Sequence, residues 1–352
     1  MGRVAGRAGG SRLLSGRKFD SRSDEDDVRV RPGRNGSRPR TRTRPTHEDA
    51  VPGLVVAVDR GRMTVRVEDP EAGPVDVTTM RARELGKHGV VVGDRVRVVG
   101  DTSGRTDSLA RIVTIEERTT SLRRTADDTD PTERIVVANA DLLVIVTAIT
   151  DPEPALGFLD RCLVAAYAGG LEPLLCLTKS DLASPQPLLD RYAGLGLDAV
   201  AISREAPLGD LLDRLADRMS VLVGQSGVGK STLVNRLVPD AFRATGDVSK
   251  IGKGRHTSSS VVLFDLPDGG MVIDTPGIRS FGLAHVTADD VLAAFDEINE
   301  AAVDCPPMCG HTAEDPECAL DAWAAAGPGA REEQLTALRV LLGAVGQVGP
   351  GY

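Results

Sequence analysis

The sequence of 352 residues has few cysteines, few aromatic residues and no long hydrophobic run. Its longest apolar stretches, 142–149 and 171–177, are far shorter than the roughly 20 residues of a membrane-spanning helix, so we expect no membrane span. Five cysteines are too few for a disulfide framework in a chain of this length. Three of them lie within residues 305–318, and this clustering favours a metal site in a reducing compartment.

The N-terminal segment also lacks the features of a targeting signal. No apolar stretch follows its first arginines, so we expect no secretory signal. The acidic run 24–27 argues against an organellar transit peptide. We therefore expect a cytoplasmic protein.

Charge is distributed unevenly along the chain. Residues 1–47 carry 13 Lys+Arg against 5 Asp+Glu, whereas the rest of the chain carries 29 against 46. The first segment is rich in Gly, Ser, Arg and Pro and has no apolar period, which predicts a disordered basic tail. Its charge pattern suits either an electrostatic arm for RNA or a solvated extension. The acidic body argues against diffuse electrostatic binding to nucleic acid, so any such contact must be local.

Residues 48–118 have the pattern of a small β-barrel of the OB-fold type. Short alternating strands are predicted at 53–58, 63–67, 75–79, 94–99 and 110–115. OB barrels often stack nucleic-acid bases on aromatic rings, but this stretch contains no Phe, Tyr or Trp. Contact with RNA would therefore use the phosphates, with Arg81, Arg83 and Lys87 as candidates. The alternative is a barrel that only packs on its neighbour.

Residues 119–286 alternate between apolar strands and helices. Helices are predicted at 157–168 and 208–219, and strands at 142–147, 174–177, 199–202, 221–223, 261–264 and 271–273. This alternation is typical of a mainly parallel sheet covered by helices. Ligands of such sheets bind at the carboxyl ends of the strands, which is where the motifs of this segment lie.

The stretch Gly224–Ser231 reads GQSGVGKS and matches the phosphate-loop motif GxxxxGK[ST], between an apolar strand and a helix. Its glycines allow backbone N–H groups to surround phosphates, Lys230 reaches the β and γ oxygens, and Ser231 binds Mg²⁺. The predicted phosphate-binding residues are Gly224, Gln225, Ser226, Gly227, Val228, Gly229, Lys230, Ser231 and Thr232.

A second phosphate-related motif, DTPG, follows at Asp274–Gly277. A carboxylate at a strand end followed by a glycine is where phosphate-loop NTPases hold Mg²⁺ and sense the γ-phosphate, so Asp274 and Gly277 are predicted nucleotide contacts. The glycine-rich stretch 250–257 lies between the two motifs and suits a mobile loop. Its Thr257 could offer a second oxygen to Mg²⁺.

Guanine recognition is predicted at Thr178–Asp181, which reads TKSD and resembles the [NT]KxD motif of GTPases. Lys179 is part of this motif, and Asp181 can accept two hydrogen bonds from guanine, whereas adenine would present an acceptor to it. Thr178 replaces the usual Asn and removes an amide that could contact the base and brace the phosphate loop, so we expect an effect on affinity. Ser203, after the next strand, could contact the guanine oxygen through its backbone.

The cysteine cluster has the spacing Cys305-x₃-Cys309-x-His311-x₆-Cys318. Three thiolates and one imidazole suit tetrahedral Zn²⁺, and four protein ligands leave no position open for catalysis. We predict one structural zinc ion here. The alternative is three free thiols beside a surface histidine.

The order of the motifs is unusual, because the guanine motif precedes the phosphate loop. Ordinary GTPases have the reverse order, so the domain is predicted to be circularly permuted, which a parallel sheet tolerates. The predicted fold is multidomain. Its parts are a disordered tail over 1–47, an OB-fold β-barrel over 48–118, a permuted α/β P-loop GTPase domain over 119–286 and a small zinc-binding helical domain over 287–352.

The permuted guanine motif, the stretch GRHT at 254–257, the DTPG motif, the barrel and the cysteine cluster together resemble the ribosome small subunit-dependent GTPase A family. The resemblance covers roughly residues 50–325 and implies a monomeric GTPase. Such a GTPase acts late in small-subunit assembly, binds the 16S rRNA of the subunit and hydrolyses GTP to GDP faster when bound. The residue after the DxxG glycine is Ile278, which cannot position water, so intrinsic turnover should be slow. The resemblance points to His256 instead, with Lys230 and Thr257 completing the catalytic set.

Two alternatives remain at this stage. The first is an RNA- or ribosome-binding module that uses GTP as a structural ligand or slow timer, and turnover stimulated by the ribosome distinguishes it from a GTPase. The second is an ATP-dependent kinase with the same phosphate loop, which Asp181 disfavours.

Overall fold

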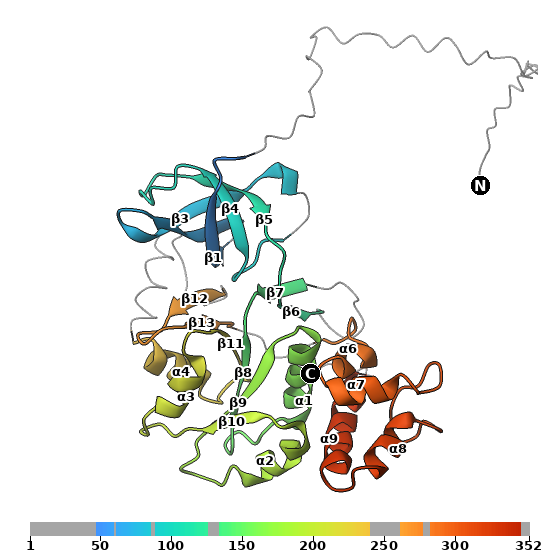
Figure 1. Cartoon of the computed structure of the whole chain (residues 1–352). Helices are drawn as coiled ribbons and strands as arrows, with labels where there is room; N and C mark the ends of the chain where they lie inside the picture. Colours follow the sequence, from blue (N-terminus) through green and yellow to red (C-terminus); the bar gives the residue numbers. More distant parts are fainter. Residues whose placement is uncertain are drawn as a thin grey trace, which may run out of the picture. The chain divides into compact units, whose positions relative to one another are not determined.

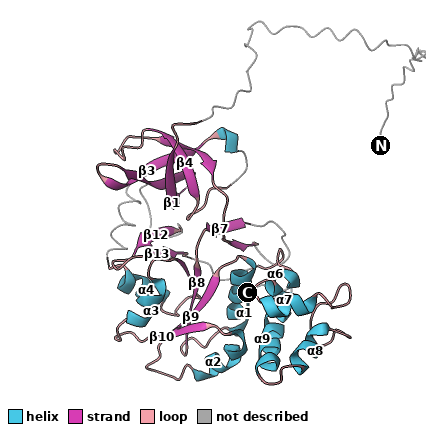
Figure 2. Cartoon of the chain, in the orientation of Figure 1, coloured by secondary structure: helices cyan, strands magenta, loops and turns pink. Residues whose placement is uncertain are grey.

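The computed structural model describes residues 47–59, 61–85, 89–125, 134–239, 261–276 and 282–345. The described residues all belong to one compact unit, His47–Tyr352. Figure 1 and Figure 2 show their strands and helices. The predicted tail lies outside the described residues except for His47.

The first five strands form a closed barrel. Its strand order is β1-β2-β3-β5-β4, and β1 pairs again with β4 to close the ring. Alternate side chains such as Val55, Val65 and Ile112 are fully buried inside, as the two-residue period of a strand requires. The predicted five-stranded barrel is confirmed. Its strands are β1 Val51–Asp59, β2 Arg62–Asp69, β3 Gly73–Arg81, β4 Arg95–Gly100 and β5 Ala110–Ile115, with a 3₁₀ helix, η1, at Arg83–Leu85.

The central sheet contains five parallel strands in the order β10-β9-β8-β11-β13. A sixth strand, β12, runs antiparallel to β13 and also pairs with β1 through Ala57 and Val262, so the barrel and the central sheet share one series of paired strands. The carboxyl ends of the five parallel strands lie at one edge. The strands are β8 Leu142–Ala148, β9 Glu172–Thr178, β10 Asp198–Ala201, β11 Met219–Val223, β12 Val262–Asp265 and β13 Met271–Asp274.

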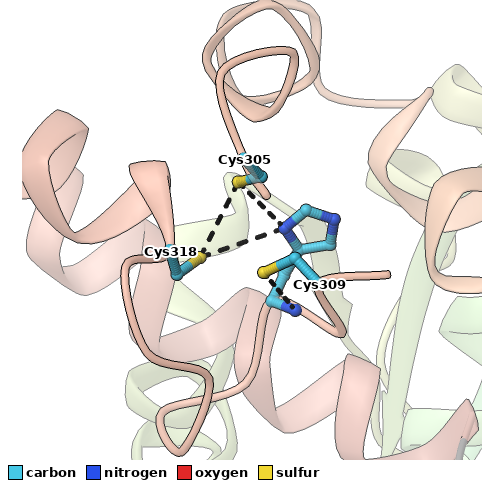
Figure 3. A group of neighbouring side chains, drawn as sticks. Cys305, Cys309 and Cys318 are labelled. Atoms are coloured by element: carbon cyan, nitrogen blue, oxygen red, sulfur yellow. Dashed lines mark hydrogen bonds between the residues drawn. The ribbon is translucent and has the colours of Figure 1, made fainter. Parts of the chain in front are cut away.

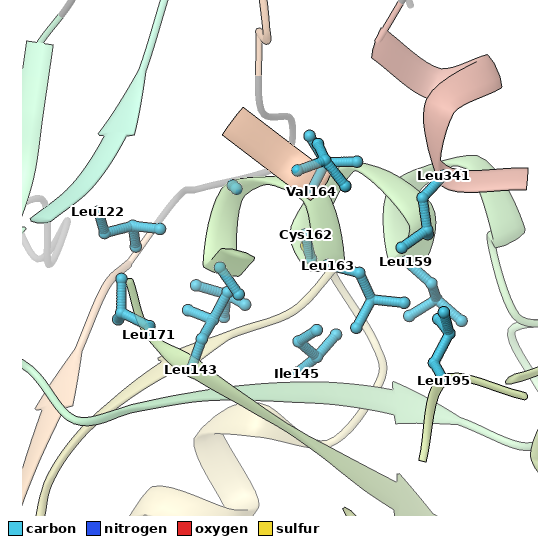
Figure 4. Close-up of a cluster of buried hydrophobic side chains, with 14 of the residues drawn as sticks. Leu122, Leu143, Ile145, Leu159, Cys162, Leu163, Val164, Leu171, Leu195 and Leu341 are labelled. Atoms are coloured by element: carbon cyan, nitrogen blue, oxygen red, sulfur yellow. The ribbon is translucent and has the colours of Figure 1, made fainter. Parts of the chain in front are cut away.

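Helices cover both faces of this sheet. Leu143 and Ile145 of β8 face α1 (Leu156–Ala168) and α2 (Gln186–Tyr192), and Figure 4 shows Leu159 and Leu163 of α1 in this cluster. The intervening residues of β8 face the other way, in a second cluster with α3 (Gly209–Leu215) and α4 (Lys230–Leu237). Full burial of each such aliphatic side chain contributes about 1.5–3 kcal/mol.

The C-terminal helices pack on the α1 side. Leu335, Leu338 and Leu341 of α9 share one helix face and belong to the same cluster as α1. Figure 4 shows Leu341 in this cluster. The segment predicted as a helical domain contains two short helices within 288–302 and a longer one at 330–345. No helix in the part of the chain that the structure describes is long and apolar enough to cross a bilayer. The helices are α6 Ala288–Leu292, α7 Asp296–Ala302, α8 Ala319–Ala325 and α9 Ala330–Val345.

Two further details differ from the sequence prediction. The helix expected at 208–219 ends at Leu215, because Asp217 adopts a left-handed φ of 56° and Met219 already begins β11. A two-stranded hairpin, β6 (Ser121–Arg124) with β7 (Arg134–Ala138), was not predicted. Its strands are too short to show a clear period in the sequence.

Candidate functional site

The phosphate loop connects β11 to α4 and ends at Gly229, which has a φ of +95° and precedes the first helical residue, Lys230. Only glycine adopts this backbone conformation without strain. A Cβ at Gly224 would lie 2.6 Å from the Val146 carbonyl oxygen, so the loop passes too close to β8 for any side chain. Ser231 and Thr232 follow in the first turn of α4, whose N-terminus favours anions. These features fit a phosphate group.

Lys230 and Asp274 meet at this edge of the sheet. The Lys230 Nζ donates to a carboxylate oxygen of Asp274, the last residue of β13, and lies 3.3 Å from the Thr275 carbonyl oxygen. Thr275 is buried, and its hydroxyl donates to the Leu222 carbonyl oxygen at 2.7 Å, which holds the end of β13 to β11. The structure therefore brings together the ammonium group of one motif and the carboxylate of the other, as a shared site of the two motifs requires.

The guanine motif directly contacts the phosphate loop. Thr178 ends β9, and its buried Oγ1 donates to the Val228 carbonyl oxygen at 2.6 Å. The amide that Thr178 lacks is therefore replaced in one of its expected roles, because the hydroxyl donates a hydrogen bond to the phosphate loop, and the expected effect on affinity stays a prediction. The Lys179 Nζ donates to the carbonyl oxygen of Asp151, in the loop after β8.

Asp181 and Ser203 follow neighbouring strands. The turn that contains Asp181 is tied to the end of β10 by a 3.1 Å hydrogen bond from Ser180 N–H to the Ile202 carbonyl oxygen. Ser203 comes directly after Ile202, and the Asp181 side chain is exposed. Both residues therefore lie at the same edge of the sheet as the phosphate loop.

Three predicted nucleotide residues, His256, Thr257 and Gly277, lie outside the described residues. Lys87 of the barrel does as well. Their roles stay predictions.

The four predicted metal ligands form one cluster. The ligand atoms of Cys305, Cys309, His311 and Cys318 all lie within 4.8 Å of one another, and Figure 3 shows the three thiols converging. The Cys305 and Cys318 sulfurs are 4.0 Å apart, and the His311 Nδ1 is 3.5 Å and 3.9 Å from them, respectively. Zinc–sulfur bonds of about 2.3 Å in a tetrahedron place two sulfurs about 3.8 Å apart, so the cluster has the right size.

The surrounding chain holds this cluster in place. His311 is 4% exposed, and its backbone N–H donates to the Cys309 sulfur at 3.4 Å. Arg339 of α9 donates from Nε to the His311 carbonyl oxygen at 3.1 Å. Desolvation, with smaller contributions from the Cys318 and Cys305 thiols, raises the pKa of Cys309 to about 11. A metal ion must therefore displace a proton from this thiol.

Two contacts near the nucleotide site were not foreseen from the sequence. Arg236 of α4 donates to the carbonyl oxygens of Ser203 and Ala206, and Asp151 accepts from Lys179. Asp151, Ala206 and Arg236 belong to no motif, and the partners in each contact lie about thirty residues apart in the sequence, so only the folded chain reveals these contacts.

Comparisons with known proteins agree with this geometry. Residues 115–284 match the RsgA GTPase family. A protein of Pseudomonas fluorescens (strain SBW25) named small ribosomal subunit biogenesis GTPase RsgA is 40% identical over 279 residues, which cover 76% of this chain and 78% of that protein. The chain belongs to the RsgA GTPase family. It is therefore an enzyme that hydrolyses GTP.

Other relatives of the same name include one from Pseudomonas savastanoi pv. phaseolicola, 41% identical over 281 residues, which cover 76% of this chain and 78% of that protein. The crystal structure of YjeQ from Thermotoga maritima is 25% identical in sequence and has a TM-score of 0.60. The match covers 85% of this chain and 99% of the YjeQ chain. The crystal structure of YloQ, described as a circularly permuted GTPase, is 24% identical in sequence and has a TM-score of 0.59. The match covers 88% of this chain and 100% of the YloQ chain. The predicted circular permutation of the fold is confirmed.

Replacement of Thr178 by Val should weaken GDP binding about threefold to tenfold. The change keeps the shape of the side chain but leaves the Val228 carbonyl oxygen without its hydrogen bond, so the phosphate loop loses its brace. Thr178→Ser keeps the hydroxyl and should bind GDP like the unchanged protein. Isothermal titration calorimetry on the three proteins measures this, and equal affinities for all three would show that the hydrogen bond does not hold the loop.

Replacement of Cys309 by Ser should abolish the retention of one metal ion per chain, because a hydroxyl is a poor zinc ligand. The C-terminal helices should lose stability with the metal, since α8 begins directly after Cys318. Elemental analysis and circular dichroism measure both effects. Cys176→Ala, which removes a buried thiol outside the cluster, should leave the metal content unchanged. Full metal retention by Cys309→Ser would contradict the ligand assignment.

Proposed function

We propose that this chain is a GTPase of small ribosomal subunit biogenesis that acts in the cytoplasm as a monomer, and that the subunit and its 16S rRNA stimulate its hydrolysis of GTP. The relatives named small ribosomal subunit biogenesis GTPase support the assignment of this chain to that process. The hydrogen bond from Thr178 to Val228 is the observation that supports the enzyme site most strongly. It joins the guanine motif directly to the phosphate loop, although the two motifs stand in reversed order, and this supports one nucleotide bound by both.

Each part of the site has a role in binding GTP. Asp181 and Lys179 recognise the base together with the loop at Ser203, and residues 224–229 with Lys230 bind the phosphates. Ser231 and Thr257 hold Mg²⁺ near Asp274. The bound Mg²⁺ would offset negative charge that develops on the β and γ oxygens. His256 positions the attacking water in this proposal.

The cysteine cluster binds one structural Zn²⁺ in this proposal. Its donor set of three thiolates and one imidazole, the separation of no more than 4.8 Å between donor atoms and the buried His311 all suit this ion. With four protein ligands, the ion has no open position for water, so it stabilises the fold without taking part in hydrolysis.

The barrel offers a site for RNA phosphates. A cavity of about 710 Å³ on the barrel is lined by Arg81, Arg83 and Arg111, with the exposed Met80 and Leu109 beside them. Three arginines around one cavity carry the positive charge and the planar donor groups that suit phosphate oxygens. The barrel has no aromatic residue for stacking, so contact with 16S rRNA should depend strongly on salt.

Purified small subunits should raise the rate of GTP hydrolysis by about tenfold or more, because Ile278 cannot position water and an added partner must complete the site. Released phosphate measures the rate, with GTP or ATP and with or without subunits. His256→Ala should keep GTP affinity but lose the stimulated rate. An unchanged rate with subunits would favour a binding module that keeps GTP as a ligand, and equal use of ATP would contradict guanine specificity.

A further inference from the structure

Arg236 connects the phosphate side of the nucleotide site to the loop after β10. It lies in the last turn of α4, the helix that begins at the phosphate loop, and its side chain is partly buried. Its Nη1 donates to the Ser203 carbonyl oxygen at 2.8 Å, and its Nη2 donates to the Ala206 carbonyl oxygen. One guanidinium thus holds two carbonyl groups of the same short loop, a geometry that its planar fork of donors suits.

These two hydrogen bonds from Arg236, called the clamp below, fix the orientation of the backbone groups of the loop. The Ser203 Oγ accepts from the Ala206 N–H at 3.2 Å, so the segment from Ser203 to Ala206 forms a closed turn. The peptide bond between Ser203 and Arg204 is trans, so the Arg204 N–H points opposite to the Ser203 carbonyl group. Because that carbonyl group faces Arg236, the Arg204 N–H points away from it. The second carbonyl group, that of Ala206, is bonded to Pro207, which has no N–H. The clamp therefore orients only one backbone donor, the Arg204 N–H.

The turn lies beside the residues that are proposed to recognise guanine. It follows β10, which pairs in parallel with β9, and Asp181 follows β9. The 3.1 Å hydrogen bond from Ser180 N–H to the Ile202 carbonyl oxygen joins the two segments just before Ser203. The turn therefore lies beside the segment of Asp181, which is proposed to contact the N1–H and the amine of the base. The remaining group on that edge of guanine is the oxygen on C6, an acceptor.

We propose that Arg236 is a positioning residue for guanine specificity, which holds the turn so that the Arg204 N–H donates to the C6 oxygen of the base. This inference rests on the proposed function of the site as a GTP site. Arg236 does not touch the nucleotide. It contributes by fixing a neutral donor before the base arrives, so that binding does not have to order the turn. Because Arg236 also belongs to α4, the same contact ties the base loop to the phosphate loop.

Equilibrium binding of three diphosphates tests the proposal, and diphosphates avoid interference from hydrolysis. GDP carries both the C6 oxygen and the amine. The 6-thio analogue replaces that oxygen by sulfur, a weak acceptor, and IDP keeps the oxygen but lacks the amine. In Arg236→Met, which keeps the apolar stem, GDP affinity should fall about threefold to tenfold, while 6-thio-GDP affinity should change less than about twofold. The ratio of GDP to IDP affinity should stay the same, because it reports on Asp181.

Two further variants make the result specific. Arg236→Lys can still donate to one carbonyl oxygen, so its preference for GDP over 6-thio-GDP should lie between those of Arg236→Met and the unchanged protein. Arg218→Met removes a different arginine, which pairs with Glu172 at 2.9 Å and precedes β11 at the opposite end of the strand, and it should change none of the three affinities.

The proposal is overturned if Arg236→Met weakens all three nucleotides equally, since that is the result of a general loss of structure. It is also overturned if no affinity changes. If Arg236→Met does not fold, the ratios measured for Arg236→Lys decide the question in the same way. Failure of the unchanged protein to prefer GDP over ADP would instead contradict the proposed guanine site itself.

Discussion

The hydrogen bond from the Thr178 hydroxyl to the Val228 carbonyl oxygen joins two loops that are fifty residues apart in the sequence. It can form because β9, β8 and β11 run parallel and adjacent, so that their carboxyl ends meet at one edge. The bond is buried, so leaving either partner without it would cost about 1–3 kcal/mol. The guanine motif and the phosphate loop are thus joined at one edge of the sheet, whatever their order along the chain.

The strand β13 connects the nucleotide site to the other parts of the chain. Its last residue, Asp274, pairs with Lys230, and β12 beside it pairs with β1 of the barrel. Arg66 of the barrel also contacts Asp265 at the end of β12 at 2.6 Å. The Asp265 side chain is 61% exposed, so this ion pair contributes little by itself, on the order of 0–1 kcal/mol. The paired strands are the stronger connection between Asp274 and the barrel.

Much of the site could be predicted from the sequence because its determinants are local. The phosphate loop needs an apolar strand, glycines and a lysine in one short stretch, and all are present at 219–231. The metal ligands lie within 305–318, and alternation of apolar residues revealed the barrel strands. The brace formed by Thr178 could not be predicted, since its partner is a backbone carbonyl group whose position depends on strand packing. The contacts of Arg236 could not be predicted either, because its partners are also backbone carbonyl groups.

The most direct test of the account is the base preference of Asp181→Asn. Asparagine offers both a donor and an acceptor, so it should pair with xanthine, which carries an oxygen where guanine carries the amine. The central claim, that Asp181 and Lys230 hold the two ends of one guanine nucleotide, predicts that the variant binds xanthosine diphosphate more tightly than GDP. The unchanged protein should prefer GDP by about tenfold or more. An Asp181→Asn variant that keeps the original preference for GDP would contradict the claim.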